Sequence, residues 1–89
     1  EASRMLTWKS AAEADAGIKN TESAAHAKRF ASDAAMQIAT DAVQVYGGYG
    51  YSEEYPVARL MRGAKVMQIY EGSSQVQRMI IGREITKDL

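Results

Sequence analysis

The sequence contains no cysteine, one histidine (His26) and one proline (Pro56) among its 89 residues. Disulfides and thiolate metal sites are therefore excluded, and a lone histidine does not form a metal site by itself. Eleven basic residues balance eleven acidic ones, so the overall charge does not attract nucleic acid or an anionic membrane. No apolar stretch approaches the roughly 20 residues of a membrane span, and no signal peptide opens the chain, so we expect no membrane insertion.

The length allows one small domain with a modest core, and the chain is too short for a complete cofactor enzyme. The chain opens with Glu1 and Ala2 rather than methionine, and the apolar spacing of a helix begins at these first residues. We therefore expect residues 1–89 to be a single domain of a longer protein.

Apolar residues at spacings of three and four, the period of one helical face, predict two helices in the first half of the chain. The first should span Ala2 to Ala16, with Gly17 as its C-terminal stop. Asn20 or Thr21 can cap the second, which should run to Tyr46. Because its apolar stripe is mostly alanine, this long helix can approach a neighbouring backbone closely.

Two further helices are predicted in the second half, after a loop of unusual composition at residues 47–50, where three of four residues are glycine. Pro56 suits the first position of the third helix. Ser74 and Gln77 have the spacing of a capping box, which predicts that the fourth helix begins at Ser74. No alternating strand pattern occurs, so the predicted fold is all-α, an up-and-down bundle of about four helices.

Two segments could carry chemistry. One is the glycine loop with Gln44 before it, and the other is the acid, glycine and hydroxyl sequence at residues 71–73. Taken separately, each has an ordinary explanation. A glycine loop after a helix is usually a C-cap and turn, and a glutamate before a helix is usually a solvated charge near the helix dipole.

Read together, the segments resemble the C-terminal signature of acyl-CoA dehydrogenases. The matching stretches are AVQVYGGYGY at 42–51, EYPV at 54–57, Arg62 with Ala64-Lys65, and IYEGSSQVQR at 69–78. Upstream, Ala27-Lys28 and Phe30 to Asp33 are similar to the long helix of that family. The order and spacing of these stretches match, and the resemblance covers nearly all of the chain.

The resemblance implies a reaction in which an acyl-CoA thioester is oxidised to the trans-2-enoyl-CoA. A hydride leaves the β-carbon for FAD, and electrons pass on to electron-transferring flavoprotein. Glu71 stands where the family has the base that removes the α-proton. A glutamate side chain titrates near about 4.3 in water, so it must be desolvated to become a stronger base.

The resemblance also implies binding residues. Gln44, Val45, Tyr46, Gly47 and Gly48 correspond to the segment that contacts the FAD of a neighbouring subunit.

Near the predicted base, Ser73 and Gln75 correspond to positions beside FAD at a helix N-terminus, and Gly72 and Tyr70 to the substrate-binding side. Three residues depart from the pattern. Ser73 replaces the commoner threonine and keeps the hydroxyl, whereas Ala58 and Gly63 each remove a carboxylate.

The expected partners are acyl-CoA, electron-transferring flavoprotein and further copies of the chain. The N-terminal helical and middle β-domains of the family lie outside these residues, so the isolated chain is expected to be inactive. Two alternatives stay open: a non-catalytic helical module that self-associates, and a domain of an acyl-CoA oxidase. Bacterial cytoplasm and mitochondrial matrix both fit, and acyl chain length is not readable.

Overall fold

The computed structural model describes all 89 residues and is entirely helical. Its helices are α1 (Ala2–Asp15), α2 (Thr21–Tyr46), α3 (Gly48–Tyr51), α4 (Pro56–Met67) and α5 (Ser74–Thr86). The four longer helices lie where the apolar periodicity predicts them, which confirms the all-α fold class.

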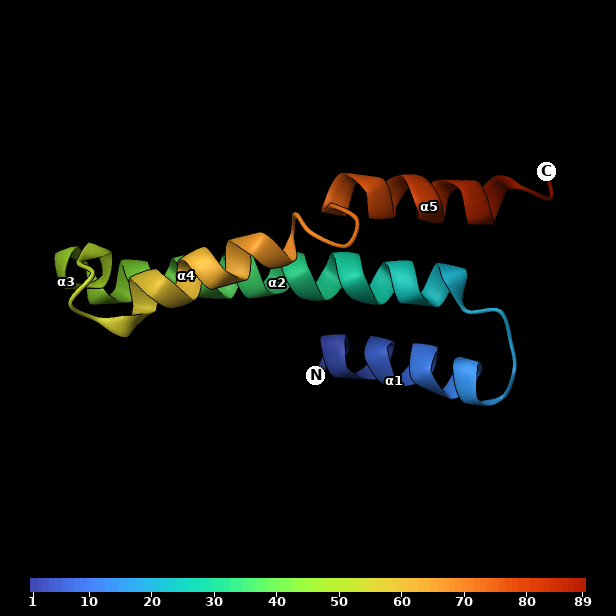
Figure 1. Cartoon of the computed structure of the whole chain (residues 1–89), viewed down its shortest axis with the longest axis horizontal. Helices are drawn as coiled ribbons and strands as arrows, with labels where there is room; N and C mark the ends of the chain where they lie inside the picture. Colours follow the sequence, from blue (N-terminus) through green and yellow to red (C-terminus); the bar gives the residue numbers. More distant parts are fainter.

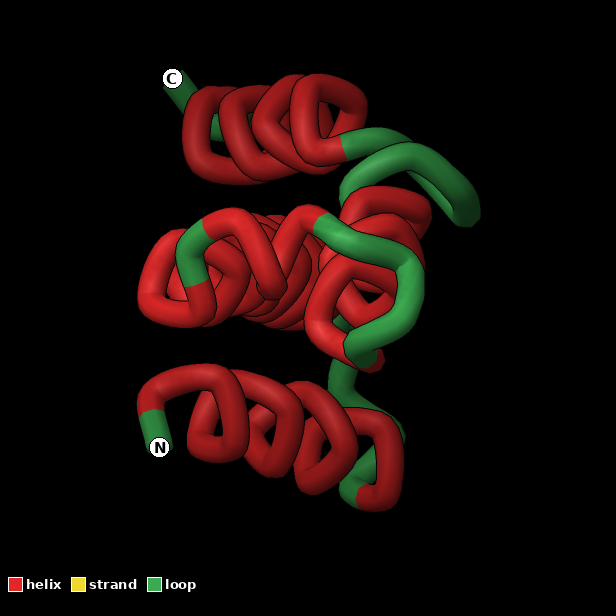
Figure 2. Tube along the Cα trace, turned by 90° about the vertical axis from the view of Figure 1, so that its left-hand side faces the viewer, coloured by secondary structure: helices red, strands yellow, loops and turns green.

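Helix α2 is the spine of the molecule, and α1, α4 and α5 each pack against it but not against one another. All three run antiparallel to α2, with α1 and α5 on opposite sides of its N-terminal half and α4 along its C-terminal half (Figure 1). The end-on view separates α5, α2 with α4, and α1 into three layers (Figure 2). The result is an elongated body of 50 × 24 × 18 Å.

The turn between α1 and α2 depends on one glycine and one asparagine. Gly17 adopts φ 73°, a backbone conformation that favours glycine, directly after the end of α1. Asn20 is the N-cap of α2, but its side chain makes no capping hydrogen bond. Instead its Nδ2 donates to the carbonyl and hydroxyl oxygens of Ser10, each at 3.1 Å, so the predicted capping residue ties the two helices together.

The prediction of a loop at residues 47–50 is wrong in part, because residues Gly48–Tyr51 form the short helix α3. Gly47 breaks α2 with φ 65°, and the chain then turns back on itself. A Cβ at Gly50 would lie 2.5 Å from the Val43 carbonyl oxygen and 2.7 Å from the Tyr46 Cβ. The glycines therefore permit a tight helical reversal, in which Gly50 packs directly on the last turns of α2.

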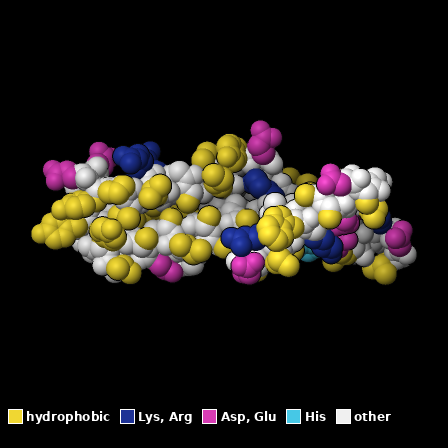
Figure 3. Space-filling view, turned by 90° about the horizontal axis from the view of Figure 1, so that it is seen from below, with side chains coloured by type: hydrophobic (Ala, Val, Ile, Leu, Met, Phe, Trp, Pro, Cys, Tyr) yellow, Lys and Arg dark blue, Asp and Glu magenta, His cyan; other side chains and the backbone are white.

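Only seven of the 89 residues are buried, and the buried hydrophobic side chains are those of Ala25 and Ala58. Ala58, a departure from the family pattern, thus packs inside. Many large apolar side chains remain exposed, among them Val45 at 84% and Met79 at 73%. Figure 3 shows apolar side chains spread over one long face of the molecule. No helix combines the length and the apolar character needed to cross a membrane.

Candidate active-site turn

Glu71 lies at the middle of the short connection between α4 and α5. The Ser74 N–H donates to the Gln68 carbonyl at 3.0 Å, which closes residues 68–74 into a small loop. Ser73 is the N-cap of α5, and its Oγ accepts from the Val76 N–H at 3.3 Å. The predicted base therefore projects from the tip of a loop whose two ends are held together.

The predicted capping box between Ser74 and Gln77 is wrong by one residue. Ser73 provides the cap, so Ser74 becomes the first residue of α5, and its Oγ donates to Asp33 Oδ1 at 2.8 Å. Gln77 turns back toward the loop instead of bonding to the N-cap backbone N–H. The start of the helix was predicted correctly, but both side chains have other partners.

The backbone at the loop tip is left-handed. Glu71 has φ 55° and is the only non-glycine residue of the chain with positive φ, and Gly72 follows with φ 91°. For a residue with a Cβ this conformation costs about 1–2 kcal/mol, and such residues cluster at functional sites. A Cβ at Gly72 would lie 2.5 Å from Gln77 Nε2, so glycine is required there for space as well.

Two side chains hold the carbonyl oxygens of this tip. Gln77, which is only 8% exposed, donates from Nε2 to the carbonyl oxygens of Glu71 and Gly72, each at 3.3 Å. Lys28, from α2, donates from Nζ to the carbonyl oxygens of Met67 at 2.5 Å and of Gly72 at 3.3 Å. The charge of Lys28 also suits the C-terminal end of α4.

Tyr70, a predicted substrate-binding residue, is exposed beside the tip. Its ring centroid lies 5.9 Å from Lys28 Nζ, and its hydroxyl donates to Met67 Sδ at 3.6 Å. Glu71 and Gln75 are also exposed, whereas Ser73 and Gly72 are partly covered. The structure thus brings together the predicted base, both predicted substrate-binding residues and two of the predicted flavin-binding residues.

Asp33, on α2, holds the two ends of the loop. Its Oδ1 accepts from Gln68 Nε2 and from Ser74 Oγ, both at 2.8 Å. Its Oδ2 lies 3.5 Å from Arg78 Nη2 and 3.8 Å from Arg29 Nη1. Burial raises the pKa of Asp33, but the two hydrogen bonds and the two arginine charges outweigh it, so the pKa lies below its ordinary value of 3.8.

This carboxylate predicts an acid-sensitive loop. Because the folded pKa lies below the unfolded one, the stabilisation from Asp33 is complete above pH 3.8 and is lost as the pH falls through the folded pKa. Asp33→Asn should increase local opening of residues 68–78 about tenfold near neutral pH, since hydrogen bonds to a charged acceptor are the stronger ones. Hydrogen exchange of these amides in the full protein, corrected for intrinsic rates, measures both effects.

Asp41→Asn is the matched control, because Asp41 is an exposed carboxylate of the same helix that bonds only to Gln37. It should leave protection of the loop unchanged. If Asp33→Asn also left it unchanged, Asp33 would not be what holds the loop ends.

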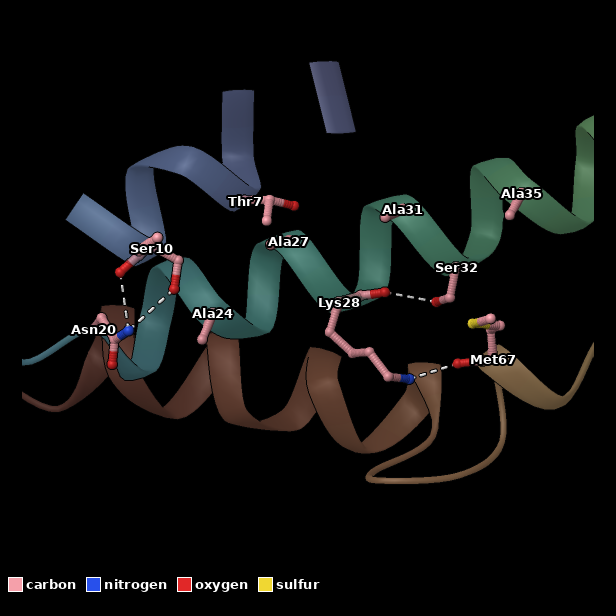
Figure 4. Close-up of a pocket in the computed structure, with 11 residues that line it drawn as sticks. Thr7, Ser10, Asn20, Ala24, Ala27, Lys28, Ala31, Ser32, Ala35 and Met67 are labelled. Carbon is pink, nitrogen blue, oxygen red and sulfur yellow. Dashed lines mark hydrogen bonds between the residues drawn. The ribbon is translucent and has the colours of Figure 1, made fainter. Parts of the chain in front are cut away.

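A pocket of about 320 Å³ opens beside the N-terminus of α5. Its lining is mostly polar and includes Asp33, Lys65, Ser73, Gln75 and Arg78. A second, larger hollow of about 610 Å³ lies between α1 and α2 along the alanine stripe, and its lining includes Lys28 and Met67 (Figure 4). The polar pocket is the one that contains predicted flavin-binding residues.

The other predicted flavin-binding residues lie elsewhere. All five residues from Gln44 to Gly48 are exposed at the far end of α2, beside α3 (Figure 1). Gln44 follows Asp33 by 11 positions on α2, which corresponds to roughly 16 Å along the helix. One chain therefore does not bring the two predicted flavin-binding groups together.

Three residues that shape the site were not predicted as site residues. Lys28 reads in the sequence as an ordinary solvated basic residue, Asp33 carries no assigned role, and Gln77 reads as a capping residue. Their partners lie 39 and 44 positions away for Lys28, and 35, 41 and 45 positions away for Asp33. A single sequence contains no signal for contacts of that range.

These features define a small helical domain that presents one carboxylate on a strained, tethered turn beside a helix N-terminus. Residues 1–86 match the family model described as acyl-CoA dehydrogenase, C-terminal domain, and the chain belongs to that family.

Similar proteins include cyclohexane-1-carbonyl-CoA dehydrogenase of Geobacter metallireducens, 57% identical over 88 residues, which are 99% of this chain and 23% of that protein. A short-chain specific acyl-CoA dehydrogenase of Megasphaera elsdenii is 58% identical over 82 residues, 92% of this chain and 21% of that protein. The chain thus spans under a quarter of the length of these relatives.

Solved structures show the same fold. The butyryl-CoA dehydrogenase of Megasphaera elsdenii superposes with a TM-score of 0.89 at 56% identity, covering 94% of this chain and 22% of that one. A chain in a structure described as electron transferring flavoprotein of Acidaminococcus fermentans gives a TM-score of 0.92 at 49% identity, covering 98% and 23%.

Proposed function

We propose that this chain is the C-terminal helical domain of an FAD-dependent acyl-CoA dehydrogenase, and that Glu71 is the base that removes the α-proton of the acyl-CoA. The observation that carries the proposal is the backbone at Glu71. It is the one non-glycine residue in a left-handed conformation, and it lies at the tip of a closed loop. Glycine would adopt this conformation without strain, so the presence of a side chain here favours a functional role for the Glu71 carboxylate.

The environment of Glu71 suits proton abstraction once substrate is present. In this chain the carboxylate is exposed, and water makes a carboxylate a weak base. An acyl chain lying against Gly72 and Tyr70 would displace that water and strengthen the base. A flavin held beside the turn would supply the acceptor for the hydride of the β-carbon.

The residues of this chain fit a flavin at two separate places. Gly47 and Gly48 have nothing within 4 Å of where a Cβ would stand, so their backbone is bare to an approaching group. Ser73 and Gln75 border a polar pocket at the N-terminus of α5, where free N–H groups suit phosphate or a polar ring edge. Their separation supports the interpretation that Ser73 and Gln75 serve one flavin while Gln44 to Gly48 serve that of a neighbouring subunit.

The rest of the enzyme would come from segments outside these residues. We infer that an N-terminal helical domain and a middle β-domain supply the other flavin and acyl-CoA contacts, and that copies of the protein associate. Exposed apolar residues on both ends of the body, such as Val45, Tyr51 and Met79, favour such burial in a larger assembly. Electron-transferring flavoprotein is the proposed acceptor of the electrons.

The experiment is a titration of the full-length protein with acyl-CoAs of increasing chain length while the flavin absorbance is recorded. Bleaching by one class of acyl-CoA is the expected result and identifies the substrate class. A protein without flavin, or one that no acyl-CoA bleaches, would leave the non-catalytic self-associating module as the function. Oxygen consumption after bleaching would identify an oxidase instead of a dehydrogenase.

A further inference from the structure

The carbonyl oxygens of the Glu71 turn are held by two side chains that come from different helices. Gln77 Nε2 lies 3.3 Å from the carbonyl oxygens of both Glu71 and Gly72, so one buried amide group donates to both carbonyls. Lys28 Nζ, from α2, donates to the Gly72 carbonyl at 3.3 Å. Both peptide groups that follow the left-handed residues are therefore fixed by side chains.

The helix ends beside the turn have hydrogen bonds of their own, apart from those of these two side chains. The last turn of α4 is closed by backbone bonds from Gln68, Ile69 and Tyr70 to carbonyls of residues 65 and 66. At the other end, Ser73 caps α5. The closure of the loop is provided by the Ser74 N–H and by Asp33.

Lys28 also binds the Met67 carbonyl at the end of α4, but what Lys28 and Gln77 have in common is their contact with the tip. Their donors are the ones that reach the Glu71 and Gly72 carbonyls. Lys28 spans from α2 to the end of α4, where Figure 4 shows its extended side chain meeting the Met67 carbonyl. Without these donors the two strained peptide units could rotate, and rotation about the Glu71 backbone would swing its carboxylate away from a bound substrate.

We propose that Lys28 and Gln77 are positioning residues for Glu71: by holding the carbonyl oxygens of Glu71 and Gly72 they fix the direction of the Glu71 carboxylate. The inference rests on the proposed role of Glu71 as base. A misplacement of about 1 Å at a reacting group can cost about 10²-fold in rate, so the three hydrogen bonds to the Glu71 and Gly72 carbonyls are enough to affect the rate.

The test uses the full-length, flavin-loaded enzyme and the variants Lys28→Met, Lys28→Arg and Gln77→Met. Methionine keeps the apolar stem and removes the donors, whereas arginine keeps charge and donors. The first readout is exchange of α-hydrogen for deuterium in an acyl-CoA without β-hydrogens, such as 3,3-dimethylbutanoyl-CoA, which reports proton removal with no hydride transfer. Steady-state kcat and KM with a reactive acyl-CoA, flavin content and thermal unfolding are the others.

For Lys28→Met and Gln77→Met we expect α-exchange and kcat to fall about 10- to 100-fold, with KM changed less than about twofold and flavin content kept. Lys28→Arg should restore exchange to within about threefold of the unmutated enzyme, since it can donate to the same carbonyls. Lys9→Met, on the exposed surface of α1, is the control for loss of a lysine and should behave as the unmutated enzyme.

Exchange at the unmutated rate in Lys28→Met would overturn the inference. So would a loss of exchange that comes with a matching loss of flavin and of thermal stability, because that is the result of a purely structural role. If Gln77→Met does not fold, the comparison of Lys28→Met with Lys28→Arg tests the inference by itself. Failure of the proposed function looks different: the unmutated enzyme would not exchange the α-hydrogen, or Glu71→Gln would exchange it equally fast.

Discussion

Glu71→Gln is expected to slow flavin reduction by acyl-CoA about 10²- to 10⁴-fold in the full-length enzyme, the range that removal of a general base produces. Glutamine has nearly the same size and shape as glutamate but has no carboxylate to accept the α-proton. Because Gln77 and Lys28 bind the backbone carbonyls of the turn and not the Glu71 side chain, the turn itself should survive the substitution. Flavin content and acyl-CoA affinity should therefore remain close to those of the unmutated enzyme.

Stopped-flow recording of flavin absorbance measures the rate, and a binding titration measures the affinity. Glu53→Gln is the matched control, since Glu53 is an exposed glutamate in the turn before α4 and loses the same charge. Glu71→Asp keeps a carboxylate but shortens the side chain, so it should give an intermediate rate. Reduction of Glu71→Gln at the unmutated rate would place the base elsewhere and reject the catalytic assignment.

The helices could be predicted from the sequence because their signals are local. Apolar spacing, Gly17 and Pro56 depend on neighbours within one or two turns. All four longer helices begin within about a residue of the predicted positions, and α1 and α2 also end there. Glu71 was predicted as the base from the resemblance of the stretch IYEGSSQVQR and its companions to the family signature. Its left-handed backbone, however, is not visible in the sequence, because glutamate does not ordinarily adopt that conformation.

The capping predictions failed for one physical reason: a partner outside the helix binds the side chain that the local rule assigns to the cap. Ser74 and Gln77 fit a capping box by spacing, but Asp33 takes the Ser74 hydroxyl, and the strained carbonyls of the turn take the Gln77 amide. Asn20 fits a cap by type, but α1 takes its side chain. In each case a polar side chain near a helix start joins two segments rather than completing one helix.

The arrangement of the helices relative to one another could not be predicted from the sequence. An amphipathic pattern predicts that a helix packs against another element, but it does not identify that element. In a closed bundle, neighbouring helices would bury one another. Here α1, α4 and α5 contact α2 but not each other. Helix α2 binds the loop ends through Asp33 and, together with Gln77 of α5, binds the loop tip through Lys28. The candidate site is therefore built on the one helix that every other element contacts.

Gly72→Ala is the substitution with the second-largest expected effect, because it destabilises the turn in two ways. The backbone at φ 91° is costly for any residue with a Cβ, by about 1–3 kcal/mol. The added methyl group would also lie 2.5 Å from Gln77 Nε2, which must move and lose its bonds to the Glu71 and Gly72 carbonyls. Since both effects displace Glu71, flavin reduction should slow about 10²-fold, and the thermal unfolding temperature should fall.

Gly63→Ala is the matched control and shows why position, not residue type, decides the result. Gly63 lies inside α4 with helical backbone and with nothing within 4 Å of where a Cβ would stand. Alanine there should leave the reduction rate unchanged and favour the helix by about 1 kcal/mol. If Gly72→Ala instead reduced flavin as fast as Gly63→Ala, the left-handed turn would be dispensable, and the direction of the Glu71 carboxylate would have to be set by contacts from outside this domain.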